Sequence, residues 1–178
     1  NLVGFLFQEV ILKLAQSALE DYVKDFFKAS IKDLVGLAKE KPLTVAFGKG
    51  IKEFLVLVQG ELEDADTNEA EIKEYEDSLN QFLQNKLVLA TLGQPFNQAL
   101  GNSSATDSQF FDTRLLAKIW NDLNLQRLPD KFNWEKVGKR YSRKVEAILR
   151  ESKELRELFD SENLAAIRAS LAESVPIS

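Results

Sequence analysis

Cysteine, histidine and methionine are all absent from this chain of 178 residues. Without cysteine, the chain can form neither a disulfide nor a thiolate metal site. Without histidine, it lacks the most common general base and the most common metal ligand. Catalysis would have to use carboxylates, lysines, hydroxyls or a bound cofactor. We therefore expect no enzymatic activity, no catalytic residues, no cofactor and no metal ion.

The missing methionine also predicts that Asn1 is not the native start, and we expect one domain of a longer protein. Only 4 prolines and 8 glycines are present, which argues against an all-β domain rich in tight turns. No apolar run has the length of a transmembrane helix. The apolar opening lacks a basic lead and a small-residue cleavage site, so it does not predict a signal peptide. We expect a cytoplasmic domain.

Apolar residues recur at helical spacing through most of the sequence, which predicts an all-α helical bundle of about four long helices with additional short helices. The stretch Leu2–Lys39 contains no proline, and its apolar residues fit one wide helix face. We expect the other helices to pack against it. Its length exceeds that of the usual globular helix, so a break is expected, near Ala29 and Ser30. The predicted buried face comprises Leu12, Ala15, Leu19, Tyr22 and Phe26.

Pro42 suits the first turn of a second helix. Gly48 and Gly50 lie within that helix, where they indicate either close packing of a neighbouring helix or a hinge. Thr67 or Asn68 can cap a third helix. The second helix has an apolar face of Val45, Ile51, Phe54, Leu55, Val58 and Leu62, and the third, which runs to about Asn85, has one of Ile72, Tyr75, Leu79, Phe82 and Leu83.

The second half of the chain begins with residues 87–100, where Gly93 and Pro95 predict one or two short helical pieces. Residues 101–108 are small and polar and form the clearest loop, which divides a single domain, 1–178, into two subparts. Helices are expected after Asp112 or Thr113, after Asn133, over residues 152–159 and after Asp160 or Ser161. The helix after Asn133 has a predicted inner face of Trp134, Val137, Tyr141, Val145, Ile148 and Leu149.

Two local patterns could suggest ligand binding, but neither has the required spacing. Gly48-Lys49-Gly50 lacks the longer glycine spacing, the following Ser or Thr and the preceding strand of a phosphate-binding loop. The acidic run over residues 61–66 lacks the ligand spacing and the glycine of a calcium loop. We expect this run to be a solvated acidic turn. No small-molecule substrate is expected.

Charge is unevenly distributed along the chain. Residues 53–77 are strongly acidic, with Lys73 the lone basic residue, whereas a basic stripe at helical spacing comprises Lys136, Lys139, Arg140, Arg143 and Lys144. The two regions can pair with each other, or the stripe can bind anionic lipid, nucleic acid or an acidic partner. The net charge of -5 disfavours general nucleic-acid binding, and we expect no nucleic-acid partner.

The apolar start of the chain is a second candidate contact surface. Its residues fit a core helix, or a helix that leaves the bundle to enter a membrane or the groove of a partner. The residues that would make this contact are Leu2, Phe5, Leu6, Phe7 and Val10.

Several short phrases, spread over nearly the whole chain, carry a family resemblance. They are residues 4–8 (GFLFQ), 21–28 (DYVKDFFK), 50–55 (GIKEFL), 61–66 (ELEDAD), 121–125 (NDLNL) and 148–152 (ILRES). Together they resemble an N-terminal helical domain found in front of the NACHT NTPase module in bacterial, especially cyanobacterial, STAND proteins. None of the phrases is a catalytic motif.

The resemblance implies a place in a signalling NTPase comparable to immune receptors. The NACHT module would bind nucleotide, a C-terminal repeat region would sense, and this domain would be an interaction, effector or autoinhibitory element. Its expected partner is the adjoining NACHT module, or another copy of itself on oligomerisation. An alternative by fold-level analogy is a membrane-active bundle of the HeLo type, acting through its N-terminal helix.

Overall fold

The structure is a computed structural model, which describes residues 5–14, 16–26, 40–99 and 111–156. The protein is all-α, as predicted, and the described residues contain no strand. The helices are α1 (Gln8–Lys13), α2 (Gln16–Phe26), α4 (Glu40–Asp64), α5 (Glu69–Lys73), α6 (Glu76–Gln84), α7 (Lys86–Ala99), α8 (Thr113–Asp122), α9 (Trp134–Glu151) and α10 (Lys153–Arg156).

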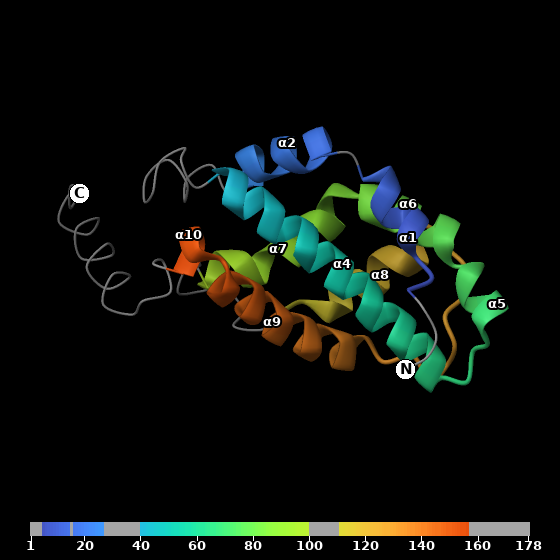
Figure 1. Ribbon diagram of the computed structural model, residues 1–178. Coiled ribbons are helices and arrows are strands. Elements are labelled where there is room, and N and C mark those ends of the chain that lie inside the picture. The colour runs from blue at the N-terminus through green and yellow to red at the C-terminus, as the bar shows by residue number, and fades with distance from the viewer. Residues whose placement is uncertain (1–4, 15, 27–39, 100–110, 157–178) are drawn as a thin grey trace, which may run out of the picture.

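Helix α4 is the central element of the bundle. It crosses the middle of the molecule, with α9 along one side and α2 over its first turns (Figure 1). It contributes a continuous series of fully buried side chains along its 25 residues, among them Phe47, Phe54 and Leu62. Among the described residues the central element is thus α4 and not the predicted stretch Leu2–Lys39, of which residues 27–39 lie outside the described residues. Val45, predicted to be buried, is 47% exposed.

The N-terminal stretch is not one helix. Helix α1 ends at Lys13, because the next residue, Leu14, has a ψ of 97° that is extended rather than helical, and α2 begins at Gln16. Phe7 and Val10 are fully buried, while Leu12, predicted to be buried, is 73% exposed. The predicted break near residues 29 and 30 lies outside the described residues.

The third predicted helix is divided into α5 and α6. Asn68 caps α5 as predicted, since its Oδ1 accepts a hydrogen bond of 2.9 Å from the backbone N–H of Glu71. Tyr75 lies at the junction, and its hydroxyl donates to the carbonyl of Arg127 over 2.6 Å. The predicted apolar face is confirmed, because every residue from Ile72 to Leu83 assigned to it is buried.

Helix α7 runs without interruption through Gly93 and Pro95, contrary to the prediction of one or two short pieces. Its residues Val88, Leu92 and Phe96 are fully buried. A proline inside a helix costs about 3 kcal/mol, whereas each buried aliphatic or aromatic side chain contributes about 1.5–3 kcal/mol. Burial of this face therefore outweighs the hydrogen bond that Pro95 cannot donate.

Helices α8 and α9 begin at the predicted caps. Asp112 accepts from the backbone N–H of Leu115, and Asn133 accepts from that of Lys136, each over 3.1 Å. Their buried side chains join the same core as the N-terminal helices, and that core extends from Phe7 to Leu155. The predicted loop 101–108 and the predicted last helix after residue 160 lie outside the described residues.

Candidate functional site

Helices α4 and α9 pack side by side with aromatic side chains between them. The rings of Phe54 and Tyr141 meet edge to face, with centroids 5.8 Å apart, and Phe54 also stacks on Trp134. A Cβ added at Gly50 would lie 2.8 Å from Cζ of Phe96 and 3.4 Å from the hydroxyl of Tyr141. Since α4 continues through this glycine, Gly50 marks close packing and not a hinge.

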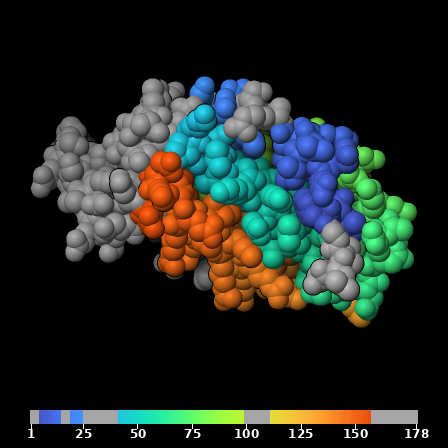
Figure 2. Space-filling model, in the orientation of Figure 1, coloured from blue at the N-terminus to red at the C-terminus, as the bar shows by residue number. Residues whose placement is uncertain are grey.

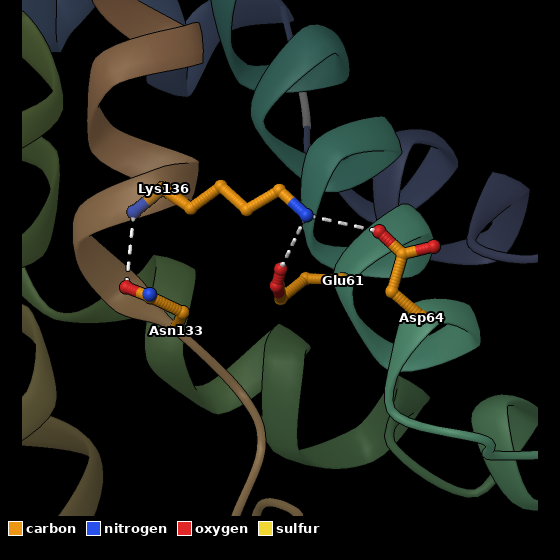
Figure 3. Close-up of polar contacts among 4 residues, drawn as sticks. All are labelled: Glu61, Asp64, Asn133 and Lys136. Atoms are coloured by element: carbon orange, nitrogen blue, oxygen red, sulfur yellow. Dashed lines mark hydrogen bonds and ion pairs between the residues drawn. The ribbon is translucent and has the colours of Figure 1, made fainter.

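Opposite charges from α4 and α9 meet along one edge of this contact. Lys136 Nζ lies 3.5 Å from Glu61 Oε1 and 3.2 Å from Asp64 Oδ2, as Figure 3 shows. Further along, Lys144 Nζ lies 3.8 Å from Glu53 Oε2. The pairing runs from the end of α4 to the start of α9, so the two helices are antiparallel. We call this edge the α4–α9 seam.

The pair of Lys136 and Glu61 is the least hydrated contact of the seam. The side chain of Glu61 is 6% exposed and that of Lys136 is 39% exposed. Removal of a carboxylate from water is costly unless a cation and hydrogen bonds compensate, so Lys136 stabilises the charge of Glu61. The expectation that residues 61–66 form a solvated turn is wrong for Glu61, which lies in the last turns of α4 and faces α9.

At the centre of the seam, the described part of α4 offers α9 no acidic partner. Residues four apart share a helix face. One row on α9 therefore consists of Lys136, Arg140 and Lys144. It faces a row on α4 that consists of Glu61, Leu57 and Glu53. The middle position of the α4 row is Leu57, which cannot pair with Arg140. A Cβ added at the nearby Gly60 would meet nothing within 4 Å. The surface of α4 at Gly60 is therefore open to an added side chain.

The predicted basic stripe thus divides into two parts. Lys136 and Lys144 are engaged by α4. Within the described residues, no carboxylate forms an ion pair with Lys139, Arg140 or Arg143, and all three side chains are exposed. We call these three residues the basic face of α9; in Figure 2 the α9 surface lies open beside α4.

The N-terminal contact residues predicted from the sequence lie against the bundle. Phe7 and Val10 are fully buried, whereas Phe5 and Leu6 are partly buried; Leu2 lies outside the described residues. The backbone N–H of Leu6 donates to Oε1 of Gln59 over 2.8 Å. Sequence analysis did not identify Gln59, although an amide on the apolar face of a helix is a signal for a buried hydrogen bond.

The three tyrosines donate hydroxyl hydrogen bonds to backbone carbonyls. Burial raises the pKa of Tyr22, Tyr75 and Tyr141, and for Tyr141 a smaller effect of the nearby Tyr22 acts in the same direction. Their acceptors are the carbonyls of Leu89, Arg127 and Leu92, respectively. These hydroxyls stay protonated at neutral pH. Those of Tyr22 and Tyr141 join α2 and α9 to α7, and that of Tyr75 holds the segment between α8 and α9.

Two surface depressions differ in their charge. A cleft of about 450 Å³ lies between the α4–α5 turn and residues 126–130, and its lining includes Glu71, Glu74 and Arg127. A groove of about 520 Å³ beside the start of α4 is lined by lysines and glutamates around Val45 and Ile148. Over the described ranges, no three acidic residues are grouped so as to hold a metal ion.

No helix in the described part of the chain has both the length and the apolar character needed to cross a membrane. In comparisons with known proteins, a family model described as NACHT N-terminal Helical domain 2 matches residues 14–178. No curated protein and no solved structure matches the chain.

Proposed function

The chain belongs to the family NACHT N-terminal Helical domain 2, and on that premise we propose that it is a non-enzymatic interaction domain. It couples oligomerisation of a NACHT-type signalling NTPase to a downstream partner. In this proposal the chain is the N-terminal part of a longer bacterial protein with a role in immunity. The domain acts in the cytoplasm, and its first partners are the adjoining NACHT module and further copies of itself.

The observation that supports an interaction role is the basic face of α9. The core of the described bundle is filled by large side chains such as Trp120 and Tyr141, both of which are buried. Lys139, Arg140 and Arg143, in contrast, are exposed and form no ion pair with another described residue. Exposed charges of one sign on a rigid helix favour recognition of an oppositely charged surface.

Enforced clustering tests the proposal. The 178-residue chain is fused to a module that oligomerises on addition of a small molecule, and the fusion is produced in a bacterial host. We expect clustering to change host growth or to recruit a host protein, whereas the unclustered fusion has neither effect. If the clustered, folded fusion behaves like the unclustered one, the effector role is wrong.

A second candidate function is membrane action by the N-terminal segment. Two observations favour it: Leu12 is 73% exposed, and Phe5 and Leu6, earlier in the same segment, are only partly buried. Phe7 and Val10 would have to leave the core for the segment to insert. If this function is correct, the clustered fusion should make anionic liposomes leak, and Leu6→Glu should abolish the leakage while the fold stays intact. Absence of leakage from the clustered fusion excludes this function.

A further inference from the structure

We propose that the basic face of α9 binds the acidic end of a second copy of this chain. The proposal rests on the proposed function and identifies the surface through which copies associate. The contact joins Lys139, Arg140 and Arg143 of one copy to the exposed carboxylates of Glu69, Glu71, Glu74 and Asp77 in another.

The acidic end is formed by the turn after α4 and by α5 and the start of α6. Its carboxylates at Glu69, Glu71, Glu74 and Asp77 are exposed. None of these four forms an ion pair with another described residue. The helix dipole at the start of α5 offsets the negative charges of Glu69 and Glu71 only in part, since such interactions are weak at an exposed surface. The acidic end therefore retains a charge that another surface can neutralise.

The basic face and the acidic end are separate surfaces of the same molecule. Figure 1 shows α5 at one end of the bundle, while α9 runs along its side toward α10. The intramolecular pairs at Lys131 and Lys136 join the two regions only at their border, through Asp66 and Asp64. Because no described carboxylate pairs with Lys139, Arg140 or Arg143, the middle of α9 can bind an external partner.

A second copy fits this arrangement because each copy offers both charges. A partner that was only acidic would satisfy α9 and leave the acidic end of this chain in solvent. Shape also favours the contact, because the 450 Å³ cleft beside α5 is open and its lining includes Glu71 and Glu74. The cleft can accept a long basic side chain such as that of Arg140.

Charge exchange between two variants tests the contact. One variant carries Lys139→Glu, Arg140→Glu and Arg143→Glu, and the other carries Glu69→Lys, Glu71→Lys and Glu74→Lys. Analytical ultracentrifugation at low salt measures association of the 178-residue chain. We expect wild type to self-associate, each variant alone to associate at least about tenfold more weakly, and an equimolar mixture to associate again. Added salt should weaken the association of the wild-type chain and of the mixture to a similar degree.

A matched control reverses the same number of charges elsewhere. Lys52→Glu, Lys86→Glu and Arg114→Glu lie at exposed positions outside both surfaces, and this variant should keep most of the wild-type association. Circular dichroism establishes that every variant folds. If the glutamate triple variant does not fold, the milder Lys139→Gln, Arg140→Gln and Arg143→Gln variant replaces it, with a smaller loss expected.

Three results would overturn the proposal: a wild-type chain that stays monomeric at low salt, a single variant that associates like wild type, or a mixture that does not recover. Binding of wild type to anionic vesicles, without self-association, would assign the basic face to a membrane instead. Enforced clustering does not depend on this contact. A response to clustering together with a failed charge exchange therefore refutes this contact alone and leaves the proposed function standing.

Discussion

Lys136 and Glu61 form an ion pair in which the carboxylate is almost completely buried and the ammonium group remains partly hydrated. Their charged atoms are 3.5 Å apart, and the exposed fractions of the side chains are 39% and 6%. The same ammonium group lies 3.2 Å from Asp64, so one lysine compensates two carboxylates at the end of α4. The contact fixes the register of α4 against α9.

Replacement of Lys136 by methionine should destabilise the fold by about 1–3 kcal/mol, because it leaves the carboxylate of Glu61 buried without a cation. Adding Glu61→Gln should recover a large part of that loss, since the amide carries no charge. Urea unfolding of both single variants and the double variant gives the coupling energy. The matched control is Lys118→Met, which removes an exposed pair with Asp122 and should change stability by about 0.5 kcal/mol or less.

Replacement of two glycines of α4 by alanine should change the stability of the fold in opposite directions. Gly50→Ala places a methyl group 2.8 Å from Phe96 Cζ, and we expect the free energy of unfolding to fall by about 1–3 kcal/mol. Gly60→Ala meets nothing within 4 Å and should stabilise the helix by about 0.5–1 kcal/mol. Thermal unfolding of both variants measures the difference. A neutral Gly50→Ala would show that α4 and α7 are not packed as closely as described.

Alkaline pH should unfold the protein through its tyrosines. The pKa of Tyr22, Tyr75 and Tyr141 is raised in the folded state, chiefly by burial. Below about pH 10, folded and unfolded chains are both protonated at these groups, and their contribution to stability does not vary with pH. Above that pH the unfolded chain loses protons that the folded chain keeps, so stability falls as pH rises, by at most about 1.4 kcal/mol per pH unit for each group.

Ultraviolet absorbance at alkaline pH, followed together with circular dichroism, checks this prediction. The signal of ionised tyrosine should appear in step with loss of helix. Tyr141→Phe should flatten the pH dependence, at the cost of a hydrogen bond to Leu92. Ionisation of all three tyrosines near pH 10 with helix content unchanged would contradict their burial.

Gln59 should control how firmly the N-terminal segment is held. Gln59→Leu keeps the volume of the side chain but removes the acceptor for the backbone N–H of Leu6, which lies 2.8 Å from Oε1. We expect residues 5–14 to exchange amide hydrogens faster and to be cut more readily by protease, while α4 and α9 stay protected. Leu12→Ser, at a side chain 73% exposed, should alter neither rate.

The sequence determined the helical class and the starts of α5, α8 and α9. Local chemistry was sufficient there, because Asn68, Asp112 and Asn133 cap the helices that directly follow them. The buried face of α9 was also predictable, since its apolar spacing matches the helical period. The break after Lys13 and the continuity of α7 through Pro95 could not be predicted, because each depends on which side chains the rest of the bundle buries.

The candidate site shows the same division. The charges of residues 53–77 and 136–144 were visible in the sequence, as was the helical spacing of the basic stripe. Which lysines are engaged was decided only by tertiary structure, because the antiparallel register of α4 and α9 sets Glu61 against Lys136 and Glu53 against Lys144. The same register leaves Leu57 opposite Arg140. Composition and spacing fix what a helix can offer, and packing fixes which of its charges remain in solvent.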